Sequence, residues 1–278
     1  MGENAKTQEY NLLAMTENIK LPKDYLDCAV EFLVKKGFRK RDIQNAYASF
    51  TNGKTFVNIY NSGSLVIQGK DTQSLKEEIL SLVKLEGIVA GCDESGKGDV
   101  FGPLVLCCCA IKPENFRKVL EIAPKDSKKI EDERLFKKVP ILENYAEFYC
   151  ISLEPEELNK LYQEKQNINR ILDWGYKKLL EDVLAKHPKA KITIAAYYHR
   201  NPFGSLVNFE PKAEEKVEVA CASMKARYEF LKWLKAHNLP KGSSPQAMDM
   251  ARRMAKTKKD CQKYLKIFFL NPNLSKLS

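Results

Sequence analysis

The sequence lacks the features that mark membrane, secreted and zinc-dependent proteins. No apolar run reaches the roughly 18 residues that span a bilayer, and Met1-Gly2-Glu3-Asn4 does not begin a charged-then-apolar signal. The 8 cysteines include no Cys-x-x-Cys pair and no histidine partners at zinc spacing. Internal repeats and low-complexity segments are also absent. We therefore expect a reduced chain in the cytoplasm that has no membrane partner.

Charge is distributed unevenly along the 278 residues. The formal net charge is +10, and the segment from Lys225 onward contains 13 basic and 3 acidic residues, so the rest of the chain is neutral overall. Concentrated positive charge favours a polyanionic partner such as nucleic acid, although a solvated helical face is an alternative. A hydrophobic content of 44% is sufficient for one large domain, or for a domain with a small appendage.

The most informative segment is the run Gly91-Cys92-Asp93-Glu94-Ser95-Gly96-Lys97-Gly98-Asp99. Asp93 and Glu94 can bind a hard divalent cation, because Mg²⁺ and Mn²⁺ prefer carboxylate oxygen. The glycines that follow let the backbone approach a phosphate or sugar, and Lys97 adds a positive charge. Buried strands are expected on either side, at residues 88–92 and 102–111. The alternative is an ordinary surface turn, since Asp, Ser and Gly are common turn residues.

Residues 1–83 are predicted to form a separate small domain. Helical spacing follows Pro22, three short alternating segments lie between turn signals at residues 47–68, and a second helix is expected at 75–85. This order predicts a sheet with helices on one face and the other face free. Phe56, Asn58 and Tyr60 share one strand face, which suits contact with nucleic acid. Alternatively, Phe56 and Tyr60 face the helices as core.

Residues 88–278 are predicted to form a second, α/β domain. Strands are expected at 148–151 and 191–198, and helices at 167–184 and 219–236. Strands that alternate with helices in this way indicate a mixed sheet with helices packed on it.

Together these segments resemble ribonuclease HIII, a family of type 2 ribonucleases H that cut the RNA strand of RNA–DNA hybrids. The Gly96-Lys97-Gly98 loop points to this family, because its sibling ribonuclease HII typically has Gly-Arg-Gly there. The resemblance implies a ribonuclease H-like mixed sheet with flanking helices, preceded by a small α+β domain like half of a TATA-binding protein. It also implies a monomer, Mg²⁺ or Mn²⁺ as cofactor, and a two-metal reaction that leaves 5′-phosphate and 3′-hydroxyl ends.

Four further motifs match the family in order and spacing. They are Asp126-Ser127-Lys128, Asn167-Ile168-Asn169, the Val-Ala-x-Ala-Ser…Ala-Arg pattern at 219–227, and Leu-Pro-Lys-Gly at 239–242. The resemblance implies that Ser127 and Lys128 hold the substrate backbone near the cut. It assigns to Gly96, Lys97 and Gly98 the recognition of the 2′-hydroxyl, the group that separates RNA from DNA.

The family uses four acidic side chains as metal ligands and catalytic groups. Asp93 and Glu94 match the first two, and Glu214 matches the fourth, which precedes the Ala-Ser helix. Glu215 is an alternative if the spacing from the fourth ligand to Val219 is one residue shorter in this chain than is usual in the family. An exposed helix start with no role in catalysis is a further interpretation of Glu214.

The third acidic position is occupied by Ala195, at the end of the strand expected near residues 191–194. No aspartate occurs between Asp182 and Asp249, so the sequence offers no shifted replacement. The loss of one oxygen ligand is expected to weaken metal binding and to impair turnover. A deliberate Asp-to-Ala replacement is favoured, because the other site motifs are intact; a natural homologue that has lost activity is the alternative.

The sequence therefore predicts an RNA–DNA hybrid endoribonuclease that is impaired at Ala195. One alternative is a hybrid-binding protein without catalytic activity. Another is a ribonuclease HII-like enzyme that cuts at junctions with single ribonucleotides, although the Gly-Lys-Gly loop and the N-terminal domain argue against it.

Overall fold

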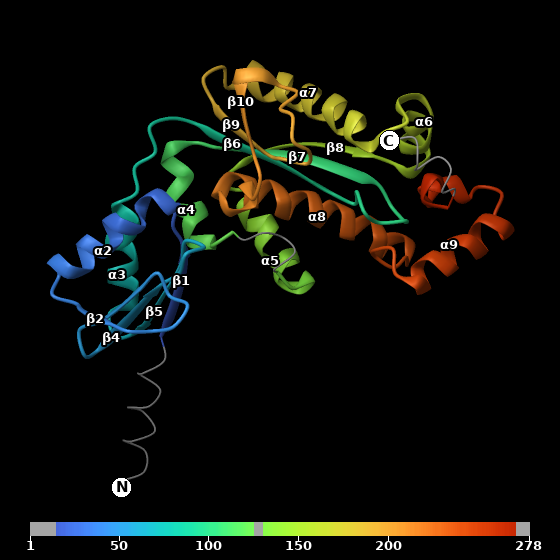
Figure 1. The fold of residues 1–278 in the computed structure, drawn as a ribbon. Helices are drawn as coiled ribbons and strands as arrows, with labels where there is room; N and C mark the ends of the chain where they lie inside the picture. The colour runs from blue at the N-terminus through green and yellow to red at the C-terminus, as the bar shows by residue number, and fades with distance from the viewer. Residues whose placement is uncertain (1–14, 125–129, 271–278) are drawn as a thin grey trace, which may run out of the picture. The chain divides into compact units, whose positions relative to one another are not determined.

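The computed structural model describes residues 15–124 and 130–270 (Figure 1). The chain divides into two compact units, one formed by residues 1–86 with 112–125 and the other by residues 87–111 with 126–278. We refer to them as the N-terminal unit and the large unit. The helix α4 (Pro113–Ile122) belongs to the N-terminal unit although it follows a strand of the large unit in sequence. We predicted one domain boundary, between residues 83 and 88, and did not predict that α4 returns to the N-terminal unit.

The N-terminal unit contains a five-stranded antiparallel sheet in the order β1-β5-β4-β3-β2. Its elements are β1 (Thr16–Lys20), η1 (Lys23–Tyr25), α2 (Leu26–Lys35), β2 (Arg39–Arg41), β3 (Ala48–Thr51), β4 (Thr55–Ile59), β5 (Ser64–Gly69) and α3 (Thr72–Ser81), together with α4. The three strands predicted from sequence are β3, β4 and β5. The edge strands β1 and β2 could not be predicted from the sequence, because each has one hydrophobic residue or none and depends on a neighbouring strand for its hydrogen bonds.

The two faces of this sheet differ as predicted. Along β4, Thr55, Val57 and Ile59 are buried, whereas Phe56 has 37% of its surface exposed and Asn58 is half-buried. The alternative that Phe56 packs as core is therefore wrong. The guanidinium carbon of Arg41 lies 4.8 Å from the centre of the Phe56 ring. The free face thus presents an aromatic ring with a stacked cation.

The large unit contains a five-stranded mixed sheet in the order β10-β9-β6-β7-β8. The strands are β6 (Val89–Ser95), β7 (Leu104–Ile111), β8 (Glu147–Leu153), β9 (Lys191–Ala195) and β10 (Val207–Glu210). The α-helices are α5 (Asp132–Leu142), α6 (Pro155–Lys165), α7 (Ile168–Lys186), α8 (Val217–His237) and α9 (Pro245–Thr257). Short 3-10 turns occur at η3 (Gly204–Leu206), η4 (Ala213–Glu215), η5 (Cys261–Lys263) and η6 (Ile267–Phe269). This is the α/β class predicted from sequence.

The central strand β6 is covered on both faces (Figure 1). It pairs with β7 antiparallel and with β9 parallel. The helix α8 approaches so closely that a Cβ atom on Gly91 would lie 2.3 Å from the backbone nitrogen of Val219. On the other face α7 packs against β7, so closely that a Cβ atom on Gly175 would lie 2.8 Å from Cδ2 of Leu106. All eight residues of β7 are buried, as expected for a strand between two helical layers.

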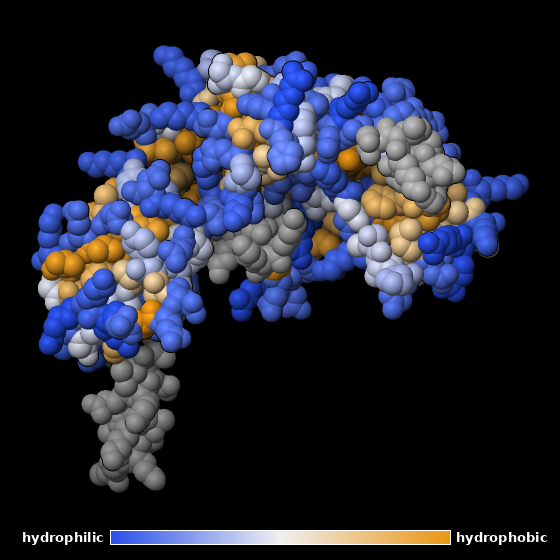
Figure 2. All heavy atoms as spheres, in the orientation of Figure 1, coloured by the Kyte–Doolittle hydropathy of each residue, from blue (hydrophilic) through white to orange (hydrophobic). Residues whose placement is uncertain are grey.

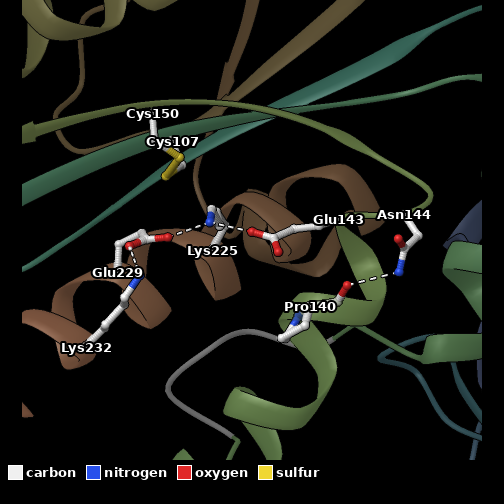
Figure 3. Close-up of polar contacts among 8 residues, drawn as sticks. All are labelled: Cys107, Pro140, Glu143, Asn144, Cys150, Lys225, Glu229 and Lys232. Carbon is white, nitrogen blue, oxygen red and sulfur yellow. Dashed lines mark hydrogen bonds and ion pairs between the residues drawn. A yellow bond between two sulfur atoms is a disulfide. The ribbon is translucent and has the colours of Figure 1, made fainter.

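The cysteines correct one prediction, because four of the eight are oxidised rather than reduced. Cys92 is joined to Cys108, and Cys107 to Cys150, with 4.1 Å between the Cα atoms in each pair. Both pairs are direct cross-strand partners in antiparallel ladders, where opposed residues come this close. Sequence spacing could not reveal them, because the pairing depends on strand register. Figure 3 shows the Cys107–Cys150 disulfide near Lys225 of α8.

Lys225 fixes α5 against α8 (Figure 3). Its Nζ atom donates to Glu143, which follows α5, at 2.6 Å and to Glu229 of α8 at 2.5 Å. Burial lowers the pKa of Lys225, but the two carboxylates outweigh burial and the pKa is raised overall. The ammonium is therefore retained at neutral pH, and α5 is held beside the first half of α8.

Hydrophilic residues cover most of the face shown in Figure 2, with scattered hydrophobic patches between them. Charged residues make up 29% of the sequence. Within residues 15–124 and 130–270, no helix combines the length and the apolar character needed to cross a membrane.

Candidate active site

The acidic pair lies within the central strand, not after it, because β6 continues to Ser95. Successive residues of a strand point to opposite faces. Asp93 therefore faces the α8 side with Gly91, whereas Glu94 faces α7. The hydroxyl of Tyr176 on α7 donates to Glu94 Oε2 at 2.6 Å, and the backbone N–H of Glu94 donates to Asp93 Oδ1 at 2.9 Å. The carboxylates are thus held from two directions.

A cavity of about 820 Å³ opens in front of this pair. Its walls combine the carboxylates, the loop that follows them and the basic side chains of α8 and the segment after it. The lining residues are Asp93, Glu94, Ser95, Gly96, Lys97, Gly98, Asp99, Ile168, Ser223, Arg227, Phe230, Leu231 and Lys241. Three of the four motifs recognised in the sequence therefore reach one cavity, and the fourth includes Ser127 and Lys128, which lie outside the described residues.

Residues 96–98, which we call the glycine loop, turn sharply after β6. Gly96 has φ +88°, and a Cβ atom there would lie 2.2 Å from the carbonyl oxygen of Pro103, so only glycine fits. The Nζ atom of Lys97 donates to Asn169 Oδ1 at 3.0 Å and lies 3.9 Å from Glu94 Oε1. Within the part of the chain that the structure describes, the backbone N–H groups of Lys97 and Gly98 have no acceptor. The loop therefore presents two donors and a cation beside the carboxylates.

The basic rim of the cavity is held by one acidic residue. Asp132, at the start of α5, accepts hydrogen bonds from Arg227 and, at 3.0 Å, from Lys241. Burial raises the pKa of Asp132, but the hydrogen bonds from Lys241 and Arg227 outweigh burial and lower it. Two cations against one carboxylate leave a net positive rim, which suits a phosphate.

Ala195 lies next to Asp93 in the sheet. The parallel register pairs Ile194 with Cys92, so the following residues, Ala195 and Asp93, share the face that is directed at α8. On its other side Ala195 is paired with Glu210 of β10. The Oε1 atom of Glu210 accepts a hydrogen bond from Lys216 at 2.8 Å. The expected strand at 191–198 ends at Ala195, so the two tyrosines that follow leave the sheet.

Glu214 lies in η4, just before α8. Neither it nor Ala195 is among the residues that line the cavity. Among the described residues, no three Asp, Glu, His or Cys side chains gather into a group that could hold a metal ion. The structure thus brings Asp93 and Glu94 together but does not add Glu214 to them, and the choice between Glu214 and Glu215 stays a prediction.

A cluster of three tyrosines, Tyr176, Tyr197 and Tyr198, lies beside Glu94 and was not predicted from the sequence. The hydroxyls of Tyr197 and Tyr198 donate to Asp173 Oδ1 at 2.6 and 2.9 Å, and the Tyr197 ring centre lies 5.4 Å from Lys97 Nζ. Burial, followed by the negative charges of Glu94 and Asp93, raises the pKa of Tyr176, which therefore stays protonated as a donor. These residues form no recognisable motif, because they come from a helix and a loop that only the fold brings together.

The donor set fits one hard divalent cation better than two. Mg²⁺ and Mn²⁺ take carboxylate oxygens and keep several waters, so Asp93 and Glu94 could hold one ion. A second ion needs a further oxygen ligand near Asp93, and the residue at that place in the sheet is Ala195.

Known proteins resemble this chain in sequence and in fold. The family model described as ribonuclease HII matches residues 90–265, which places the chain in the type 2 ribonuclease H class of hydrolases. Ribonuclease HIII from Aquifex aeolicus is 37% identical over 244 residues, covering 86% of this chain and 93% of that protein. The chain belongs to the ribonuclease HIII family.

Solved structures agree with this assignment. The crystal structure of Aquifex aeolicus RNase H3 has a TM-score of 0.61 and 36% identity, and the alignment covers 91% of this chain and 99% of that one. A Mn²⁺ complex of Bst-RNase HIII has a TM-score of 0.64 over 95% of this chain and 98% of its own. At 20% identity, this second match shows the fold alone.

Proposed function

We propose that this chain binds RNA–DNA hybrids as a monomer and that its cavity is built for endonucleolytic hydrolysis of the RNA strand, with 5′-phosphate and 3′-hydroxyl products. One observation carries the proposal: the acidic pair, the glycine loop and a basic rim line a single cavity. The carboxylates supply metal ligands, the loop supplies donors for a ribose, and the rim supplies cations for phosphates. The membership in the ribonuclease HIII family supports the same reading.

Each part of the cavity has a separate role in this proposal. The N–H groups of Lys97 and Gly98, which have no acceptor among the described residues, bind the 2′-hydroxyl of a ribonucleotide. Arg227 and Lys241, which both bind Asp132 on one rim of the cavity, hold a phosphate there, with Ser127 and Lys128 as further contacts implied by the family motif. Binding releases counterions from the phosphates, and a higher salt concentration opposes this release. We therefore expect the affinity to fall as the salt concentration rises.

Asp93 and Glu94 are proposed as metal ligands, with Glu214 as the fourth acidic group. A bound Mg²⁺ or Mn²⁺ would activate water and stabilise the leaving oxygen. Because Ala195 supplies no oxygen next to Asp93, we expect the protein to bind hybrids but to cleave them slowly. Hybrid binding without cleavage is the second candidate function, and the alanine at position 195 favours it. The Gly-Lys-Gly sequence of the loop argues against cutting at single-ribonucleotide junctions.

The experiment that tests hybrid recognition compares three duplexes of one sequence: RNA–DNA, DNA–DNA and RNA–RNA. Fluorescence anisotropy at several salt concentrations gives the dissociation constant for each. We expect the hybrid to bind at least about tenfold more tightly than DNA–DNA, which corresponds to roughly 1.4 kcal/mol for the lost 2′-hydroxyl contacts. Equal affinity for all three duplexes contradicts hybrid recognition.

We expect Phe56→Ala to weaken hybrid binding about fivefold to tenfold, roughly 1–1.4 kcal/mol, because an exposed aromatic ring can pack as an apolar wedge against a base step of a duplex. The ring lies on the free face of the N-terminal sheet with Arg41 above it, so its loss leaves the core intact. Anisotropy measures the effect. Val34→Ala serves as the control, since Val34 is 56% exposed on α2, away from that face. Equal weakening by both variants argues against a contact between Phe56 and the duplex.

We expect Tyr176→Phe to weaken Mn²⁺ binding about tenfold, because groups that hydrogen-bond a metal-binding carboxylate tune its affinity and orientation. The lost hydroxyl is the 2.6 Å donor to Glu94. Electron paramagnetic resonance of free Mn²⁺ measures the binding. Tyr149→Phe is the matched control, since that hydroxyl donates to Glu147, a carboxylate outside the cavity, at 3.1 Å. Unchanged Mn²⁺ affinity in Tyr176→Phe removes Glu94 from the metal site.

A further inference from the structure

Lys266 lies completely buried between η5 and η6 and contacts the glycine loop from behind. Its Nζ atom donates to the carbonyl oxygens of Gly96 at 2.6 Å, Asp99 at 2.8 Å and Phe101 at 3.3 Å. An ammonium group has three N–H donors, so all three are used. The charged form is therefore stabilised by three backbone carbonyls from the short segment between Gly96 and Phe101.

Burying the charged side chain of a lysine costs folding free energy. Burial lowers the pKa of Lys266 to about 7, although the negative charge of Asp99 acts in the opposite direction. Lysines of globular proteins are almost never fully buried unless they are paired with an acidic group. Among the contacts of this Nζ atom, the hydrogen-bond partners are carbonyl oxygens only. An apolar side chain could fill the same space, so a requirement for the three donors explains the lysine better than packing does.

The backbone that carries Lys266 is itself fixed. Asn159 of α6 donates to the carbonyl of Leu265 and accepts from the N–H of Ile267, both at 2.8 Å. The N–H of Lys266 donates to the carbonyl of Val100 at 2.9 Å. The lysine is therefore held from both sides at a defined distance from the loop, as a rigid support for it.

Two of the carbonyls that bind Lys266 flank the part of the glycine loop that lines the cavity. The carbonyls of Gly96 and Asp99, on either side of Lys97 and Gly98, are both bound to Lys266. The two peptide N–H groups between them have no acceptor among the described residues and belong to residues that line the cavity. The Lys266 amino group thus fixes the backbone on both sides of the two groups that are proposed to bind the 2′-hydroxyl.

We propose that Lys266 is a positioning residue for RNA recognition, and that it shapes the glycine loop by binding the carbonyls of Gly96, Asp99 and Phe101. This inference rests on the proposed function, because it assigns the loop to the ribose of the RNA strand. Without the three donors, the loop relaxes and its N–H groups leave the geometry that a ribonucleotide requires. Contacts to phosphates, which come from other residues, remain.

The test compares Lys266→Met with Lys263→Met, a control in the same segment whose ammonium is exposed and paired with Asp260. Dissociation constants for matched RNA–DNA and DNA–DNA duplexes are measured together with the ¹H–¹⁵N spectrum of the free proteins. We expect Lys266→Met to weaken hybrid binding about tenfold and DNA–DNA binding less than about twofold. The Gly96 and Gly98 resonances shift or broaden in Lys266→Met and stay in place in Lys263→Met.

Equal weakening on both duplexes contradicts the proposal, because it indicates a general structural role. Unchanged hybrid binding in a folded Lys266→Met protein contradicts it as well. Should Lys266→Met not fold, Lys266→Gln provides the test, since a side-chain amide retains two N–H donors and is expected to give a smaller loss confined to the hybrid. Should the unmodified protein show no preference for the hybrid, the proposed function fails, and the loop resonances of Lys266→Met still decide whether Lys266 shapes the loop.

Discussion

The Ala195→Asp variant is expected to hydrolyse the RNA strand of an RNA–DNA hybrid at least about 100-fold faster than the unmodified protein, a difference of roughly 2.7 kcal/mol in activation free energy. The register places residue 195 beside Asp93 on the face directed at α8. A carboxylate there adds an oxygen ligand next to the existing pair, and metal-assisted hydrolysis depends on fixed oxygen ligands. The measurement is cleavage of an end-labelled hybrid under single-turnover conditions with Mn²⁺ or Mg²⁺.

Ala195→Asn is the matched control for this experiment, because it has nearly the same shape as Asp without the charge. We expect it to remain as slow as the unmodified protein. Asp93→Asn in the Ala195→Asp background should remove the gain, and so should a chelator. Cleavage that is equally undetectable in the unmodified and Ala195→Asp proteins would falsify the hydrolase proposal and leave hybrid binding as the function of the cavity. Equal gains from Asp and Asn would show that shape, not charge, limits the reaction.

The second large effect concerns stability. Gly91→Ala is expected to lower the free energy of unfolding by about 3 kcal/mol, because excess volume in a closely packed core costs roughly 1–3 kcal/mol and more where the neighbours cannot move. The added Cβ atom would lie 2.3 Å from the nitrogen of Val219 and 2.4 Å from the carbonyl carbon of Glu218. Both are backbone atoms in the first turn of α8, so no side-chain rotation relieves the clash.

Urea denaturation followed by circular dichroism measures this loss. Gly98→Ala is the control for stability, since a Cβ atom there meets no heavy atom within 4 Å. It should change the free energy of unfolding by less than about 0.5 kcal/mol. A Gly91→Ala protein as stable as the Gly98→Ala protein would show that α8 can withdraw from β6. In that case the close packing behind Asp93 is not what fixes the acidic pair.

Local patterns in the sequence predicted the elements that carry their own signal. The apolar run of β7 and the helical spacing of α7 and α8 depend on each segment's own residues, and all three were predicted within a few positions. The acidic pair was found for the same reason, because Asp93 and Glu94 are adjacent in the chain. The glycine that follows them is required by a local turn, which a short motif can encode.

Contacts between distant segments could not be predicted in this way. The disulfide between Cys107 and Cys150 depends on the register of β7 and β8 across 43 residues. The hydroxyl of Tyr176 reaches Glu94 across 82 residues, and nothing in its own surroundings in the sequence distinguishes it from a core tyrosine. Lys266 is one of many basic residues in a basic segment, and only the fold shows that it is buried.

The contact between Lys266 and Gly96 joins residues 170 positions apart, and this separation has a consequence for synthesis. A ribosome makes the glycine loop long before it makes the lysine that supports it. The strand β9 and the helix α8, which complete the surroundings of the acidic pair, are also made before the lysine, but the loop lacks its three-carbonyl support until the segment around η6 has emerged and docked. An unfinished chain that already displays Asp93 and Glu94 should therefore distinguish RNA from DNA poorly, and selectivity should appear late in translation.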